Sequence, residues 1–143
     1  MKPLEGYKIA FKKGLKGFAQ APQSSYKKEI HVSNTLRKKL TDKELRAVLY
    51  HELFHKKYNT SIILIWSALW ILGVGISRNI FVLVAALFSI IPSIWILELC
   101  ADIYSAKKNG KYPLGNAFHK LDVVGDWLHP SPFLRWRVIN LFT

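Results

Sequence analysis

One helix, expected over residues 41–59, constrains the fold of this chain more than any other stretch. Thr41 is a suitable N-cap, and Glu44, three residues later, completes a capping box. Apolar residues then recur at spacings of three and four, which is typical of an amphipathic helix. In its centre, residues 51–55 read His-Glu-Leu-Phe-His. The rest of the chain is expected to be organised around this helix.

The His-Glu-x-x-His pattern predicts a metal site. Positions i and i+4 of a helix lie one turn apart on the same face, so the imidazoles of His51 and His55 can converge on one ion. Glu52 projects about 100° around the helix axis, beside the ion. From there it can take a proton from a metal-bound water. The alternative is a pair of surface histidines on a solvated helix, and a third ligand would decide between the two.

Charge and composition narrow the class of protein. The 143 residues include 21 Lys and Arg against 9 acidic residues, which gives a net charge of +12. A basic balance suggests nucleic acid, anionic lipid or acidic substrates as partners. The hydrophobic content of 50% favours a lipid bilayer, and no recognised nucleic-acid-binding motif is present, so no nucleic-acid partner is expected. This length predicts one domain over residues 1–143.

The first 40 residues predict a small antiparallel sheet. Short strands are expected over residues 6–11, 15–21 and 29–33, where polar and apolar residues alternate. Residues 22–25, Pro-Gln-Ser-Ser, supply a turn between the last two strands.

After residue 59 the composition changes abruptly. Residues 61–77 and 80–97 carry no charge and are separated by Arg78-Asn79. As helices they would span about 25 and 27 Å, slightly short of a hydrocarbon core of about 30 Å. Residues 61–97 therefore predict a two-helix transmembrane hairpin. The alternative, a hairpin buried in a soluble core, would need more surrounding protein than the chain has.

The basic residues predict an orientation for this hairpin. Only Arg78 lies within it, which leaves 20 of the 21 Lys and Arg outside. The positive-inside rule then places both termini and the active site on the cytoplasmic side of an integral membrane protein with two spans.

Glu98 is the candidate third ligand. A hairpin returns its second helix beside its first, so Glu98 is expected near His51 and His55. A carboxylate at the end of an uncharged span is costly unless something compensates its charge. A zinc ion would do so, and catalytic zinc commonly takes two His and one Glu and leaves the fourth position to water. Asp102, one turn further on, is placed to accept the second N–H of a ligating histidine.

Together these motifs resemble the HtpX and CAAX-prenyl endopeptidase family of integral-membrane zinc metallopeptidases. Residues 98–102, Glu-Leu-Cys-Ala-Asp, match its E-x-x-A-D motif, whose Glu is the third zinc ligand. Residues 16–20, Lys-Gly-Phe-Ala-Gln, are similar to its substrate-receiving edge strand. His129-Pro130 with Arg135 matches its late His-Pro…Arg motif. The motifs occur in the family's order and cover most of the chain.

The resemblance implies an α+β, zincin-like fold that is mainly helical, with the transmembrane hairpin between its two zinc-ligand helices. The expected parts are the sheet region 1–40, the helix 41–59, the hairpin 61–97, the third-ligand helix 98–109 and C-terminal helices in 111–143.

The resemblance also implies a zinc endopeptidase that cleaves membrane or unfolded polypeptides at the membrane face. His129 would stabilise the oxyanion, Arg135 would pair with Asp102 or Glu98, and the edge strand would include Gly17, Phe18 and Ala19. Lys16 stands where the family often has Asn, so that residue's role is not carried over. A chain shorter than most members could work alone or as a homo-oligomer. The alternative function is a non-catalytic, zinc-stabilised membrane sensor or adaptor.

Overall fold

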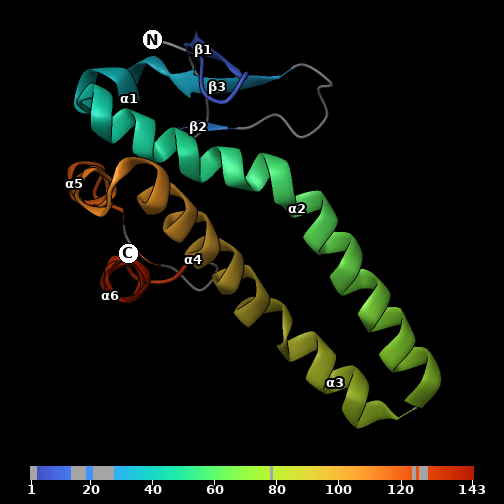
Figure 1. The fold of residues 1–143 in the computed structure, drawn as a ribbon. Coiled ribbons are helices and arrows are strands. Elements are labelled where there is room, and N and C mark those ends of the chain that lie inside the picture. The colour runs from blue at the N-terminus through green and yellow to red at the C-terminus, as the bar shows by residue number, and fades with distance from the viewer. Residues whose placement is uncertain (1–2, 14–18, 21–27, 78, 124, 126–128) are drawn as a thin grey trace.

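The structure, a computed structural model, describes residues 3–13, 19–20, 28–77, 79–123, 125 and 129–143. This part of the chain is mainly helical, with a small sheet beside the first half of the longest helix (Figure 1). Its strands are β1 (Lys8–Lys12), β2 (Ala19–Gln20) and β3 (Glu29–Ser33). Its helices are α1 (Asn34–Lys39), α2 (Asp42–Ser77), α3 (Ile80–Phe88), α4 (Ile90–Asn109), α5 (Lys111–Lys120) and α6 (Pro132–Phe142).

The sheet is mixed, with strand order β1-β3-β2. β3 lies in the middle, parallel to β1 and antiparallel to β2. The prediction of a wholly antiparallel sheet is therefore wrong. Alternation of polar and apolar residues marks where strands form, but it does not say which strands pair. Here β2 pairs on the far side of β3 and not with its sequence neighbour β1, which lets β1 and β3 run in the same direction.

The main core lies between the sheet, α1 and the first half of α2. Alternate residues of β3, Ile30 and Val32, are fully buried against this helix. The leucines that complete the core come from the segment before β1, from α1 and α2 with the residue between them, and from the end of α5: Leu4, Leu36, Leu40, Leu45, Leu49, Leu53 and Leu121. Burial of these side chains fixes the half of α2 that carries the histidines.

The predicted capping box is present at the start of α2. The Thr41 backbone N–H donates to Glu44 Oε2 at 2.8 Å, and the Glu44 N–H donates to Thr41 Oγ1 at 3.4 Å. Lys120 of α5 also donates to Glu44, at 2.8 Å. Burial raises the pKa of Glu44, but the hydrogen bonds from Lys120 and Thr41 outweigh it and hold that pKa below its ordinary value. The first turn of α2 is thus tied to α5.

α4 packs directly against α2, and small residues allow this close approach. Ala101 and Ser105 of α4 are fully buried, and the Ser105 hydroxyl donates to the Ala47 carbonyl at 2.6 Å. Further along, the Asn109 side chain donates to the Lys43 carbonyl at 2.8 Å. α4 runs back beside α2 in the antiparallel direction (Figure 1). Glu98 of α4 lies 3.4 Å from His51 and 3.2 Å from His55 of α2.

A turn near the N-terminus is tied to the same two helices. Glu5 and Gly6 both have positive φ, 48° and 82°, a conformation that non-glycine residues rarely adopt. The Glu5 carboxylate pairs with Lys57 of α2 and, at 3.0 Å, with Lys108 of α4. It also accepts from the Tyr104 hydroxyl, at 3.1 Å to the nearer oxygen. These contacts stabilise a turn that is unfavourable on local grounds.

The predicted two-span hairpin and integral-membrane localisation are contradicted. Within the described residues, no helix combines the length and the apolar character needed to cross a membrane. The uncharged part of α2, residues 61–77, covers only about 25 Å, against about 30 Å for a hydrocarbon core. The second predicted span is interrupted near Ser89, which separates α3, of nine residues, from α4. Helix α4 carries Glu98 and further charged residues. The predicted cytoplasmic orientation of the termini and the active site depended on those spans and loses its basis.

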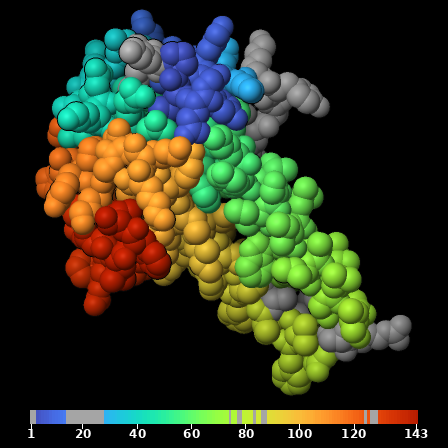
Figure 2. All heavy atoms as spheres, in the orientation of Figure 1, coloured from blue at the N-terminus to red at the C-terminus, as the bar shows by residue number. Residues whose placement is uncertain are grey.

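The second half of α2, with α3, projects as a narrow arm from the compact part of the molecule (Figures 1 and 2). Many apolar side chains on this arm are exposed, including Ile71 at 71% and Ile76 at 81%.

Candidate metal centre

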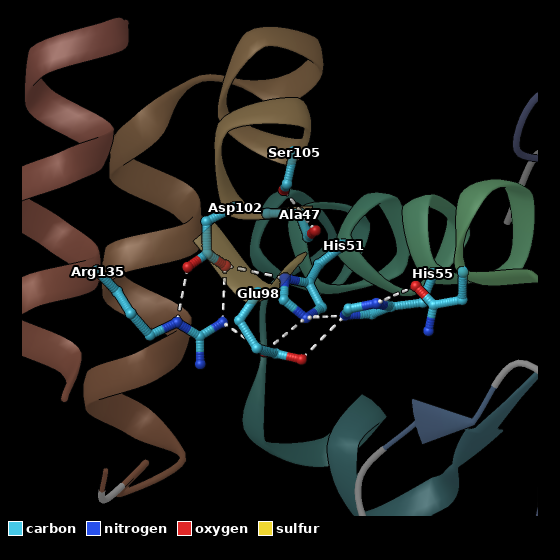
Figure 3. Close-up of polar contacts among 8 residues, drawn as sticks. Ala47, His51, His55, Glu98, Asp102, Ser105 and Arg135 are labelled. Atoms are coloured by element: carbon cyan, nitrogen blue, oxygen red, sulfur yellow. Dashed lines mark hydrogen bonds and ion pairs between the residues drawn. The ribbon is translucent and has the colours of Figure 1, made fainter. Parts of the chain in front are cut away.

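Two helices bring three potential metal ligands together (Figure 3). His51 and His55 come from the anchored half of α2, and Glu98 comes from the facing turn of α4. The two Nε2 atoms lie 3.0 Å apart. Glu98 Oε1 lies 3.2 Å from His55 Nε2, and Glu98 Oε2 lies 3.4 Å from His51 Nε2. In the described part of the chain these three residues form a group that could hold a metal ion.

The spacing of the ligand groups suits a small ion. Zinc binds His nitrogen and carboxylate oxygen at about 2.0–2.2 Å, so two ligands of a tetrahedral site lie about 3.3–3.6 Å apart. The two Nε2 atoms, 3.0 Å apart, are slightly closer than this, and each Glu98 oxygen lies 3.2 or 3.4 Å from one of the two histidines. A zinc ion on both Nε2 atoms and one Glu98 oxygen would therefore require only small movements of these side chains.

Asp102 and Arg135 orient the first histidine. His51 Nδ1 lies 2.9 Å from Asp102 Oδ1, and the Asp102 side chain is fully buried. Arg135 of α6 donates to the same carboxylate through two nitrogens, at 2.6 and 2.7 Å. Its Nη2 also lies 3.6 Å from Glu98 Oε2. A carboxylate on the outer nitrogen of a ligating imidazole fixes the ring and its tautomer, which is the position predicted for Asp102.

The charges of the site are strongly coupled. Burial disfavours a charged His51, but its hydrogen bonds to Asp102 and Glu98 outweigh this and raise its pKa to about 10. Burial raises the pKa of Glu98, yet the bonds to His51 and His55 lower it overall. Burial also raises the pKa of Asp102, but the hydrogen bonds from Arg135 and His51 lower that pKa overall. A proton on His51 thus compensates carboxylates that a bound metal would otherwise compensate, and metal binding must displace that proton.

His55 has a different outer partner, Asn59. His55 Nδ1 lies 3.0 Å from Asn59 Oδ1, one turn further along α2. An amide oxygen only accepts hydrogen bonds, so Nδ1–H is the donor and Nε2 is left facing Glu98. Asn59 was not among the predicted site residues. The signal that would have found it is its spacing of four residues from His55, the spacing that already links the two histidines.

An aromatic cluster beside the site was also missed. Phe54 packs against the rings of His55, Tyr58 and Tyr104, with ring centroids 6.1, 4.9 and 5.7 Å apart respectively. Tyr50 contacts Tyr104 at 6.4 Å. The spacing of residues 50, 54 and 58 by four was a readable sign of a common helix face.

The two residues that are predicted to be catalytic, Glu52 and His129, lie in different segments of the chain. Glu52 is half-buried on α2, directly after His51. His129 is exposed in the segment before α6. Ser131 lies two residues further on and caps α6 by accepting the Leu134 N–H at 3.3 Å.

The predicted substrate strand is described only in part. Gly17 and Phe18 lie outside the described residues. Ala19 belongs to β2, one of the two outer strands of the described sheet, where it pairs with Val32.

Comparison of the chain with protein-family models, with curated proteins and with solved structures gives no match. The resemblance of its motifs to the HtpX and CAAX-prenyl endopeptidases therefore stays a prediction.

Proposed function

We propose that the chain is a zinc-dependent endopeptidase. The observation that carries this proposal is the triangle of ligand atoms from His51, His55 and Glu98, with a buried Asp102–Arg135 pair behind it. Two His and one Glu form a common ligand set of catalytic zinc, which leaves one position open. All three ligand side chains retain some exposure, between 11% and 16%, so water and substrate can reach the group.

The chemistry divides between the ion and the chain. A bound zinc ion would supply Lewis acidity and lower the pKa of its water from about 15.7 to about 7. Glu52 would hold the proton of the attacking water on its carboxylate and pass it to the leaving amine. His129 would donate to the oxyanion, a contact whose loss typically costs about 2.7–4 kcal/mol.

The substrate proposed for this site is an extended polypeptide. Ala19 lies in an outer strand of the sheet, and an extended segment can add to such an edge through backbone hydrogen bonds.

Metal analysis and proteolysis of casein, run in parallel on the wild type and Glu52→Gln, test the proposal. We expect one zinc per chain in both proteins and cleavage only by the wild type. Equal cleavage by Glu52→Gln would refute the proposed mechanism, and the absence of zinc from both would refute the site.

A second candidate is a module that binds zinc without catalysis. It is favoured by the position of the group, because the ligands and the Arg135 contact join three helices, α2, α4 and α6. A metal there would stabilise the fold whether or not it reacts. Stoichiometric zinc with no cleavage of casein or other unfolded polypeptides would support this candidate over the peptidase.

A further inference from the structure

An apolar groove runs between the second half of α2 and the first half of α4. Its volume is about 470 Å³, within the range of about 300–1,000 Å³ that ligand-binding clefts usually have. Its lining residues carry no charge: Ile62, Ile63, Trp66, Ser67, Trp70, Ile71, Ser89, Ile90, Ser93, Ile94 and Leu97.

The groove continues the helix faces that carry the metal ligands. On α2, residues 55, 59, 62, 66 and 70 follow one another at steps of three and four, so they share one face. On α4, Ile94 and Ile90 precede Glu98 by one and two turns, and Leu97 is its direct neighbour. The metal group therefore stands at one end of the groove.

We infer that this groove binds an apolar segment of the polypeptide substrate and that the cleaved bond lies a few residues from that segment. The inference rests on the proposed peptidase activity. The uncharged lining would reject charged segments, because burying an unpaired charge is costly. The exposed side chains of Ile63 and Ile71 would gain from contact with an apolar partner.

The length of the groove determines how many apolar residues a test substrate needs and how far they should lie from the cleaved bond. Residue 62 lies seven residues beyond His55, which is about 10 Å along the helix. An extended chain covers that distance in about three residues. The groove then follows α2 to residue 71, about 13 Å further, or about four extended residues. The segment should therefore have about four apolar residues and begin about three residues from the cleaved bond.

The experiment uses the full-length, zinc-loaded protein and three peptides that share one cleavable sequence. The first peptide has no apolar block, the second has a four-residue leucine block three residues from the bond, and the third has the same block ten residues away. The blocks are placed on either side of the bond in two series. We expect kcat/KM to rise at least about tenfold for the second peptide only, which corresponds to about 1.4 kcal/mol.

Two variants and a matched control locate the effect. Ile71→Asn makes the groove lining polar, and Ser67→Trp fills the groove with an apolar side chain. Both should remove most of the gain from the block and leave cleavage of the first peptide unchanged. Ile76→Asn changes another exposed isoleucine of α2, 81% exposed and outside the groove lining, and should keep the gain.

The outcomes separate the groove from the peptidase activity. If the first peptide is cleaved but the block gives no gain, the groove inference is wrong and the proposed function stands. If no peptide is cleaved, the proposed function fails, and calorimetric binding to Glu52→Gln protein still tests the groove. In that assay we expect about tenfold tighter binding of the second peptide than the first, and equal affinities would overturn the inference.

Other occupants of the groove would give different experimental results. A fluorescent fatty acid that binds wild type but not Ile71→Asn, with no gain from the peptide block, would assign the groove to an acyl chain. A wild-type dimer that Ile71→Asn converts to a monomer in sedimentation, again with no gain, would assign it to a second copy of the chain. Either result would overturn the inference.

Discussion

At the scale of single residues, the two histidines of the site differ in their outer partners. His51 faces the Asp102 carboxylate, whereas His55 faces the neutral amide of Asn59. A carboxylate partner makes a ligating imidazole more basic than an amide partner does. A metal ion bound there would therefore receive negative charge from Glu98 and from the Asp102–His51 pair, and none from Asn59.

Asn59→Leu should weaken zinc binding about tenfold, the lower end of the usual effect of such outer partners. The His55 Nδ1–H loses its acceptor, and its Nε2 is no longer held toward Glu98. Competition with a chelator measures the affinity. An unchanged affinity would show that Asn59 does not position this ring.

Asp102→Asn should reduce zinc affinity by about 10- to 100-fold. It should also destabilise the fold by about 3 kcal/mol, because Arg135 loses its buried counter-charge. Chelator competition and urea unfolding measure the two effects. Asp122→Asn, which changes an exposed aspartate, is the matched control and should leave both values unchanged. Equal behaviour of the two variants would rule out the Asp102 contacts as a support of the site.

Much of the site was predictable residue by residue, because helix periodicity relates His51 to His55 and Glu98 to Asp102 without any tertiary information. Asn59 obeys the same rule and was missed because amide side chains are common and carry no metal signature of their own. The role of His129 could not be inferred from spacing, because it depends on how an irregular segment before α6 is placed.

At the scale of elements, α2 is the helix on which the site is built, and its start is fixed by the capping box. Its full extent, from Asp42 to Ser77, joins two stretches that the composition had separated at residue 59. A change in composition is therefore not a helix boundary unless a stop signal such as glycine or proline accompanies it.

Thr41→Ala should lower the free energy of unfolding by about 1 kcal/mol, because the Glu44 N–H loses its side-chain acceptor. Urea unfolding followed by circular dichroism measures the change. Thr60→Ala, in the middle of α2 and exposed, is the control and should be neutral or slightly stabilising, because alanine favours helix. Equal destabilisation by both variants would contradict the role of the capping box.

Elements were predicted better than their arrangement. The positions of β1 and β3 follow from alternation, but the parallel pairing of these strands depends on β2 taking the far edge. The two uncharged stretches were correctly predicted to be helical. They were wrongly predicted to span a membrane, because the second is interrupted near Ser89 and each is short of the length that a span needs. The pairing of strands and the continuity of helices both depend on contacts between distant parts of the chain, and local sequence patterns carry no information about these contacts.

At the scale of the whole molecule, the N-terminal turn, α2 and α4 are joined through Glu5. The hydrogen bonds from Lys57 and Lys108 lower the pKa of Glu5 from 4.5 to about 2. A carboxyl group whose pKa is lowered by folding stabilises the fold above its unfolded pKa, and this contribution is lost as the pH falls toward the folded pKa.

Glu5→Gln should therefore be less stable than the wild type at pH 7, and the difference should shrink between about pH 5 and pH 2. Urea unfolding of both proteins across this range measures it. In a Lys57→Met, Lys108→Met background the substitution should have little effect at any pH. A stability difference that is constant with pH would contradict the ion-pair account.

The central claim is that one metal ion binds between α2 and α4 on His51, His55 and Glu98. X-ray absorption at the zinc edge, on protein loaded with one equivalent of zinc, tests it most directly. The claim predicts a shell of two imidazole nitrogens and carboxylate or water oxygen at about 2.0–2.2 Å, with the imidazole signal halved in His55→Ala. Sulfur at about 2.3 Å, which would implicate Cys100, or a spectrum that the Glu98→Gln and His55→Ala substitutions leave unchanged, would contradict it.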